Sequence, residues 1–379
     1  MATISELDGA TLRRLSGLRP ERAKVLSIYL NLDPHDFATP AARSTAITSL
    51  LDEADRRARG DGLEHAERMA LREDVERARE FFAGDFSAKH AGALAVFACG
   101  PVGLFEALRL PRPVPSEVVV DDTPWVEPLV RFSRPDRVCA VLVNRRVARF
   151  LRGSRDRLEE LATVEDDVHG WHDQGGWSQP RYQRGIEKEI QDHLAHASRR
   201  LFALFRRRPF DRLLVGATTE LWPAFERQLH PYVAERVIAR FDIDVENATP
   251  EQVREAVAPL IDEAEREREQ AALERLRQGL GAGNRATAGL EPVLEALNER
   301  RVAVLLFEEG AQLQGVVCPH DGWLGVDVAE CPLDGTPVER RENVVEDAVE
   351  AAVLQAADPI ALEPGELAEH GRIAAVLRF

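Results

Sequence analysis

The feature that most constrains the fold is the alternation of short apolar runs with longer segments rich in Glu, Arg and Ala. The run 24–34 (KVLSIYLNLDP) alternates apolar and polar residues and stops at Asp-Pro, and 91–100 (AGALAVFACG) is an apolar run bounded by glycine. Both patterns are typical of strands. Residues 41–58 and 63–82 have the apolar spacing of amphipathic helices. Strands that alternate with helices predict an α/β fold, and we expect a first, mixed-sheet domain over residues 1–135.

A second group of elements predicts a central α/β domain over residues 136–280. Residues 138–151 form two apolar runs around a short polar turn and indicate a β-hairpin. A helix is expected over about 185–207. A longer helix starts after Thr249, which has the position of an N-cap and is followed by proline at the first helical position.

A third, small α/β domain is expected over residues 281–379. It opens with a loop rich in Gly and Ala. A strand pattern at 300–310, a helix pattern at 342–356 and a final strand pattern at 371–379 follow. The sequence therefore predicts a three-domain α/β protein.

Several features of the composition indicate the compartment. No run of 18 apolar residues occurs, so neither a membrane span nor a membrane partner is expected. The first residues, MATISELDGATLRRL, lack the apolar core of a signal peptide. Four cysteines in 379 residues are typical of a reducing compartment. We therefore predict a cytoplasmic protein.

The distribution of charge restricts the type of nucleic-acid partner. The formal net charge is −16, which argues against a protein that binds nucleic acid with its whole surface, and no DNA partner is expected. Residues 181–208, however, contain eight Lys or Arg against three Asp or Glu. This local positive segment predicts either a patch that binds RNA or a solvated helix with an Arg-rich C-terminal end.

Just before this basic segment the chain reads HDQGGWSQPRYQRGIEKEI over residues 172–190, a polar stretch with two glycines and a glutamine. Together with the order of elements around it, this stretch resembles the archaeo-eukaryotic class of peptide-chain release factors, which includes pelota and the peptidyl-tRNA hydrolase of eukaryotic ribosome quality control. A bacterial branch of that superfamily is the nearest resemblance. The middle domain of the family carries a GGQ or GGSQ-like loop, followed by arginines and a helix. The corresponding residues here are Gly175, Gly176, Trp177, Ser178, Gln179, Arg181 and Arg184.

The resemblance implies hydrolysis of the ester of peptidyl-tRNA on the ribosome or its large subunit, in translation rescue or quality control. Gly175 and Gly176 would shape a narrow loop, and Gln179 would orient water or donate to an oxyanion, with Ser178 in the same catalytic loop. RNA contacts would come from an aromatic side chain that stacks on a base and from cations that bind phosphates. These residues are Trp177, Arg181, Arg184, Lys188, Arg199 and Arg200.

Three alternatives remain open for this stretch. A pelota-like adaptor would bind the ribosome or tRNA without catalysis. An ordinary loop would fold Trp177 back onto the core. A metal-dependent hydrolase would use His169 and His172 beside the carboxylates of 165–167. Enzymatic activity as a peptidyl-tRNA hydrolase is favoured over all three alternatives.

The third domain contains a repeated Cys-Pro-x-Asp-Gly pattern, at 318–322 and 331–335. Two Cys-Pro-x-Cys-Gly turns would mark a zinc ribbon, and here aspartates occupy the places of the second cysteines. The pattern predicts a degenerate zinc-ribbon-like insertion, with a metal-free double turn favoured and no cofactor expected. The alternative is a structural zinc, with His320 as a substitute ligand, held by Cys318, Asp321, Cys331 and Asp334.

Overall fold

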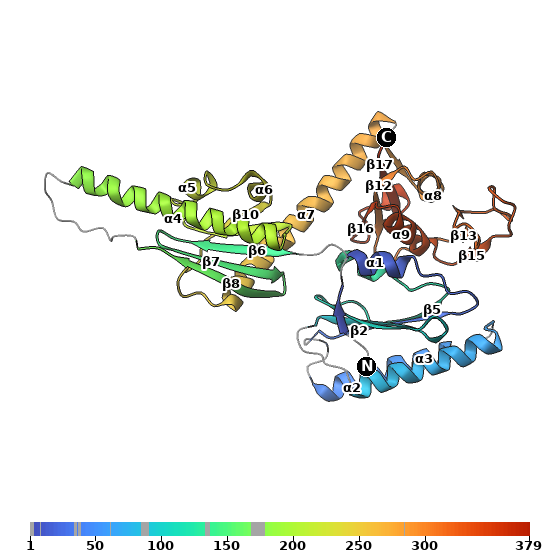
Figure 1. Ribbon diagram of the computed structural model, residues 1–379. Coiled ribbons are helices and arrows are strands. Elements are labelled where there is room, and N and C mark those ends of the chain that lie inside the picture. The colour runs from blue at the N-terminus through green and yellow to red at the C-terminus, as the bar shows by residue number, and fades with distance from the viewer. Residues whose placement is uncertain are drawn as a thin grey trace. The chain divides into compact units, whose positions relative to one another are not determined.

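The computed structural model confirms the α/β class and divides the chain into two compact units (Figure 1). Unit 1 combines Met1–Arg134 with Glu269–Phe379, and unit 2 is Pro135–Arg268. The structure describes residues 4–7, 9–33, 36, 39–60, 62–84, 91–132, 137–167, 179–283 and 285–379. None of the helices in these ranges is long and apolar enough to cross a membrane. The division into three domains stays a prediction.

The N-terminal part of unit 1 is a five-stranded sheet in the order β1-β4-β3-β2-β5. Its strands are β1 (Ile4–Glu6), β2 (Val25–Asn31), β3 (Ala93–Cys99), β4 (Leu104–Leu110) and β5 (Glu117–Asp121). β1 pairs with β4 in parallel, and the other neighbours pair antiparallel. β3 is buried on both faces, as its unbroken apolar sequence predicts. One face packs against α1 (Gly9–Ser16), and the other packs against α2 (Pro40–Arg57) and α3 (His65–Gly84).

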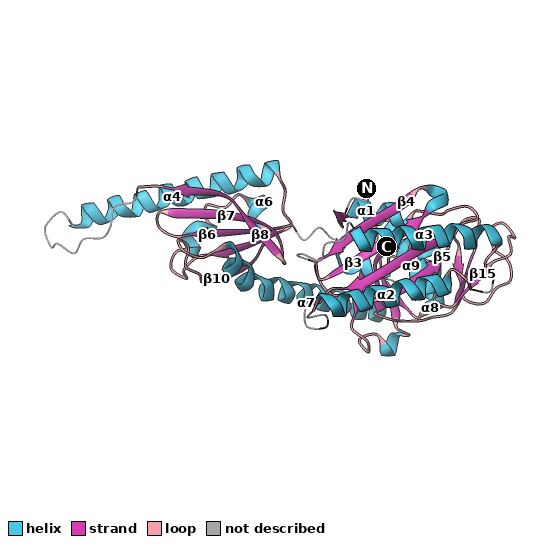
Figure 2. Cartoon of the chain, turned by 90° about the horizontal axis from the view of Figure 1, so that it is seen from below, coloured by secondary structure: helices cyan, strands magenta, loops and turns pink. Residues whose placement is uncertain are grey.

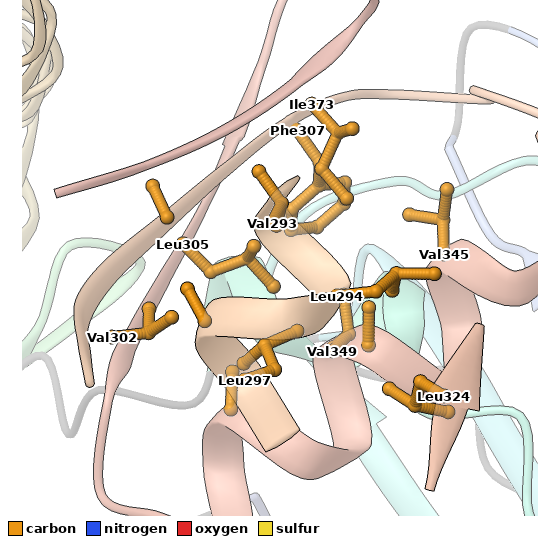
Figure 3. Close-up of a cluster of buried hydrophobic side chains, with 14 of the residues drawn as sticks. Val293, Leu294, Leu297, Val302, Leu305, Phe307, Leu324, Val345, Val349 and Ile373 are labelled. Atoms are coloured by element: carbon orange, nitrogen blue, oxygen red, sulfur yellow. The ribbon is translucent and has the colours of Figure 1, made fainter. Parts of the chain in front are cut away.

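The C-terminal part of unit 1 is a four-stranded sheet in the order β11-β17-β12-β16. Its strands are β11 (Ala286–Ala288), β12 (Val302–Glu308), β16 (Asp358–Leu362) and β17 (Ile373–Leu377). One face packs against α8 (Leu290–Asn298) and α9 (Val344–Leu354), whose apolar side chains interdigitate with those of β12 (Figure 3). The other face packs against the C-terminal turns of α7 (Pro250–Ala282). An insertion after β12 carries β13 (Gly315–Val317), β14 (Leu324–Gly325) and β15 (Glu339–Arg341).

The two parts of unit 1 share an interior. Val353 of α9 belongs to the apolar cluster of α1 and the N-terminal sheet. Val130, in the short helix η2 (Glu127–Phe132), belongs to the cluster of the C-terminal sheet. Arg19 also pairs with Glu350 of α9 at 2.6 Å. These contacts explain why segments from the two ends of the sequence form one unit.

Unit 2 is built on a five-stranded sheet in the order β10-β9-β6-β7-β8 (Figure 2). Its strands are β6 (Val138–Val143), β7 (Val147–Ser154), β8 (Arg157–Glu165), β9 (Arg212–Gly216) and β10 (Val237–Phe241). β6, β7 and β8 form an antiparallel meander, whereas β9 runs parallel to both β6 and β10. α4 (Gln179–Arg207), α5 (Trp222–Glu226) and α6 (Pro231–Ala234) cover one face, and the N-terminal turns of α7 cover the other.

Local expectations for unit 2 are confirmed in two places and wrong in two. The hairpin of β6 and β7 is present, with Asn144 Oδ1 accepting hydrogen bonds within its turn. α7 begins with Thr249 and Gln252 capping each other at 3.3 and 2.9 Å, and Pro250 is its first residue. β8 was not expected, because its polar sequence buries only two side chains at the edge of the sheet. α4 begins at Gln179 rather than near residue 185, since a proline in the first turn needs no hydrogen bond from its nitrogen.

Candidate nucleic-acid interface

The expected catalytic loop lies mostly outside the described residues. This holds for Gly175, Gly176, Trp177 and Ser178, so their roles remain predictions. The structure describes the backbone of Gln179 as the first residue of α4. His169 and His172, the ligands of the alternative metal site, also lie outside the described residues.

α4 is amphipathic, and its apolar stripe determines which side chains reach solvent. Ile186, Leu194, Ala197 and Leu201 recur at helical spacing and are buried. The last three pack in the cluster that includes Val141 and other residues of β6 and β7. The helix has 29 residues, which corresponds to a length of about 43 Å.

The exposed side of α4 carries several cations, with Glu187 and Asp192 interspersed. Arg184, Lys188, Arg199 and Arg200 are all exposed. Lys188, Arg199 and Arg200 form no salt bridge with any residue that the structure describes, so their charges are available to a partner. A row of exposed cations on a rigid helix suits the phosphates of RNA.

A His-Asp-His cluster connects α4 to the end of β8. His193 Nδ1 lies 2.7 Å from Asp166 Oδ2, and His196 Nδ1 lies 3.1 Å from the same oxygen. Because a carboxylate only accepts hydrogen bonds, His193 carries its proton on Nδ1. Its Nε2 is buried and has no partner among the described residues. Burial alone would raise the pKa of Asp166, but the hydrogen bonds from the two histidines outweigh burial and lower it.

The cluster fixes the distance between the end of β8 and the fifth turn of α4. The chain between these two elements contains the Gly-Gly segment. Sequence reasoning assigned Asp166 to a possible metal site and did not identify His193 or His196. Their spacing of three residues on a predicted helix was the available signal, since such residues face the same side. We assign the cluster a positioning role.

Four neighbouring rings lie at the C-terminal turns of α4, those of Phe202, Phe205, His230 and Tyr232. Phe202 stacks on His230 with ring centroids 3.8 Å apart and an interplanar angle of 8°. Tyr232 lies 5.1 Å beyond His230 and is 60% exposed. At the other end, the guanidinium of Arg236 lies 4.7 Å from the ring centroid of Phe205. Phe202, Phe205 and His230 are half-buried, so Tyr232 is the ring of this group that is open to an unpaired base, the kind of base that stacks on aromatic side chains.

In unit 1 the structure brings the two Cys-Pro-x-Asp-Gly turns together. One ligand atom from each of Cys318, Asp321, Cys331 and Asp334 lies within 4.8 Å of the others. The two thiols are buried and the two carboxylates are exposed. The residues that the sequence pattern grouped are therefore neighbours in space.

Unit 2 thus has the form of an α/β domain with a basic helix suited to RNA. Residues 124–266 match the model of the family described as "Bacterial archaeo-eukaryotic release factor family 10", a stretch that contains the whole sheet of unit 2 and α4. Over these residues the chain is similar to the bacterial branch of the archaeo-eukaryotic release factor superfamily. The resemblance inferred from the sequence is confirmed at this level.

Three solved structures are similar to the chain at low identity. An archaeal translation termination factor, aRF1, is 17% identical, with 99% of each chain covered and a TM-score of 0.27. Archaeoglobus fulgidus Pelota is 18% identical, with 76% of this chain and 79% of that chain covered and a TM-score of 0.35. S. cerevisiae Dom34 is 9% identical over the same shares, with a TM-score of 0.41. No curated protein matches the sequence.

Proposed function

We propose that the protein hydrolyses the ester between a nascent peptide and tRNA on the ribosome or its large subunit, in translation rescue. The main support for this proposal is that the Gly-Gly-Trp-Ser-Gln segment leads in sequence directly into α4. Both lie within the residues that match the release factor family. Gln179 is the first residue of a long helix, at the end where backbone amides carry partial positive charge.

The chemistry explains why the segment needs no acid, base or nucleophile. Water attacks the ester carbonyl and an oxyanion develops, so a donor that is already in place lowers the barrier without any shift in its pKa. The amide of Gln179 would supply this donor or orient the water. Gly175 and Gly176 would let the backbone enter a narrow site formed by ribosomal RNA.

The exposed cations of α4 would bind tRNA or ribosomal RNA. Lys188, Arg199 and Arg200 are spread over more than a third of the helix, so they would contact several phosphates along one strand. Binding of this type weakens as salt rises, because each neutralised phosphate releases counterions. Replacing Arg199 and Arg200 by Glu should weaken binding to ribosomes and reduce its dependence on salt. Binding to tRNA and to the ribosome is part of this proposal.

The test is the release of labelled peptide from peptidyl-tRNA on purified large subunits. We expect Gln179→Ala to reduce the rate by about 10²–10³, the typical effect of losing one oxyanion donor. Gln191→Ala is the matched control, because it makes the same change at an exposed position of the same helix. A release rate that Gln179→Ala leaves unaltered would refute the catalytic assignment.

A second function, that of a non-catalytic adaptor, is favoured by the position of the basic surface. Arg199 follows Gln179 by about 30 Å of helix, so binding to RNA does not require the glutamine. If neither wild type nor Gln179→Ala releases peptide, and both bind subunits equally, the protein is an adaptor.

A further inference from the structure

Residues 326–340, the second half of the insertion between β12 and α9, bury almost no apolar side chain, whereas Val317 and Leu324 before them pack in the core of unit 1. Every side chain of 326–340 is exposed or half-buried except that of Cys331. Val326, Val328 and Leu333 are exposed, Leu333 by 72%. The ordering of each residue costs conformational entropy, and small folds with little apolar burial offset this cost with disulfides or metals. Cys318 and Cys331 are both free thiols, so no disulfide performs this role.

The two Cys-Pro-x-Asp-Gly turns have the same backbone hydrogen bonds. The amide of Gly322 donates to Cys318 O, and the amide of Gly335 donates to Cys331 O, each at 2.9 Å. Both glycines have a φ of 75°, which favours glycine. Each turn thus presents its Cys and Asp in the same way, and the insertion brings the ligand atoms of the two turns together.

Each aspartate is anchored through one oxygen. Asp321 Oδ1 accepts from the amide of Trp323, and Asp334 Oδ1 accepts from the amide of Thr336, both at 2.9 Å. Asp321 Oδ2 lies 3.5 Å from Cys331 Sγ. Asp334 Oδ2 lies 2.7 Å from Nδ1 of His320, a side chain that is itself exposed. The amides of Trp323 and Thr336 and the ring of His320 therefore hold the two carboxylates in place before any ion binds.

The donor set fits a tetrahedral ion. Zinc takes thiolate at about 2.3 Å and carboxylate at about 2.0–2.2 Å, which places its donor atoms about 3.3–3.8 Å apart. The four ligand atoms already lie within 4.8 Å of one another. The amide of Leu333 points at Cys331 Sγ from 3.4 Å and would stabilise a thiolate there. Two soft sulfurs favour zinc over magnesium or calcium.

We propose that Cys318, Asp321, Cys331 and Asp334 form a structural site for a divalent ion of the zinc type, which orders the insertion 318–338. His320 is a positioning residue that holds Asp334 toward the ion. The site lies in unit 1 and does not depend on the activity proposed for unit 2. Two carboxylates in place of two thiolates would bind zinc less tightly than a four-cysteine site and release it more readily to chelators.

The experiment uses the full-length chain, reduced and stripped of metal, and titrates it with Co(II). We expect saturation at a single site, with the charge-transfer absorption of cobalt–thiolate bonds and the visible bands of tetrahedral cobalt. Zinc should then displace the cobalt. Limited proteolysis with and without zinc, read by mass spectrometry, should show protection of 326–340 by the metal.

The variants separate a metal site from a metal-free double turn. Asp334→Asn should weaken binding by about tenfold or more, since even the loss of an outer partner of a ligand costs about 10–100-fold. Asp327→Asn is the matched control, because it is an exposed aspartate of the same insertion outside the cluster. Asp334→Cys should tighten binding of zinc. The absence of thiolate bands in the wild type, or equal affinity in Cys318→Ser/Cys331→Ser, would overturn the proposal.

Discussion

A group of carboxyl groups inside unit 1 should make this unit less stable as pH rises. Glu346 of α9 is only partly exposed, and its Oε1 accepts a hydrogen bond from Asn343 Nδ2 at 3.1 Å. Burial, and then the charge of Glu127, raises the pKa of Glu346 from 4.5 to about 8. The pKa of Glu127 is raised to about 7, chiefly by burial. The protonated forms are therefore favoured in the folded unit.

The sign and size of the effect follow from linkage. Glu346 has a higher pKa when folded, so its contribution to stability is fully present below pH 4.5 and is lost as pH rises through 8. Between these values the unfolded chain is ionised while the folded chain holds the proton. Each such group then lowers the free energy of unfolding by about 1.4 kcal/mol per pH unit. From pH 5 to pH 7, Glu346 alone should account for about 2–3 kcal/mol.

The perturbation is Glu346→Gln, which keeps the shape of the side chain and cannot ionise. The assay is urea unfolding at pH 5, 6 and 7, with hydrogen exchange of the 344–354 peptides as a probe specific to unit 1. We expect the variant to become more stable relative to wild type as pH rises. Glu342→Gln, an exposed change of the same charge, should leave the slope unaltered. Equal slopes for wild type and Glu346→Gln would refute the reasoning.

Two further predictions concern unit 2. Arg149 is 9% exposed, pairs with Glu160, and donates to two backbone carbonyls at 2.8 and 3.0 Å, so Arg149→Met should destabilise unit 2 by about 3 kcal/mol in urea unfolding. Arg152→Met, at a more exposed position of the same strand, should cost clearly less. Gly153 leaves no room for a side chain, because an added Cβ would lie 1.8 Å from the carbonyl oxygen of Arg157. Gly153→Ala should therefore lower the melting temperature and speed hydrogen exchange in β7 and β8, and unchanged exchange would contradict this.

Much of the fold was predictable because it depends on local interactions. The periodicity of apolar residues predicted the buried strands β2, β3 and β6 and the helices α2 and α3. The cap of α7 was predictable because Thr249, Pro250 and Gln252 interact within one turn of helix. The Cys-Pro-x-Asp-Gly repeat indicated two equivalent turns, since each turn is closed by its own glycine.

Tertiary structure decided the features that join distant segments. β8 is a strand because β7 supplies its hydrogen bonds, whereas its own sequence buries only Leu158 and Val164. The pairing of Asp166 with His193 and His196 depends on where a strand end and a helix face meet in space. Likewise, the two ends of the chain form one unit through contacts between α9 and the N-terminal sheet. The sequence by itself determined most of the helices and strands and the chemistry that each carries. Packing between distant elements decided the edge strand β8 and which side chains became neighbours, because those contacts have no counterpart in local periodicity.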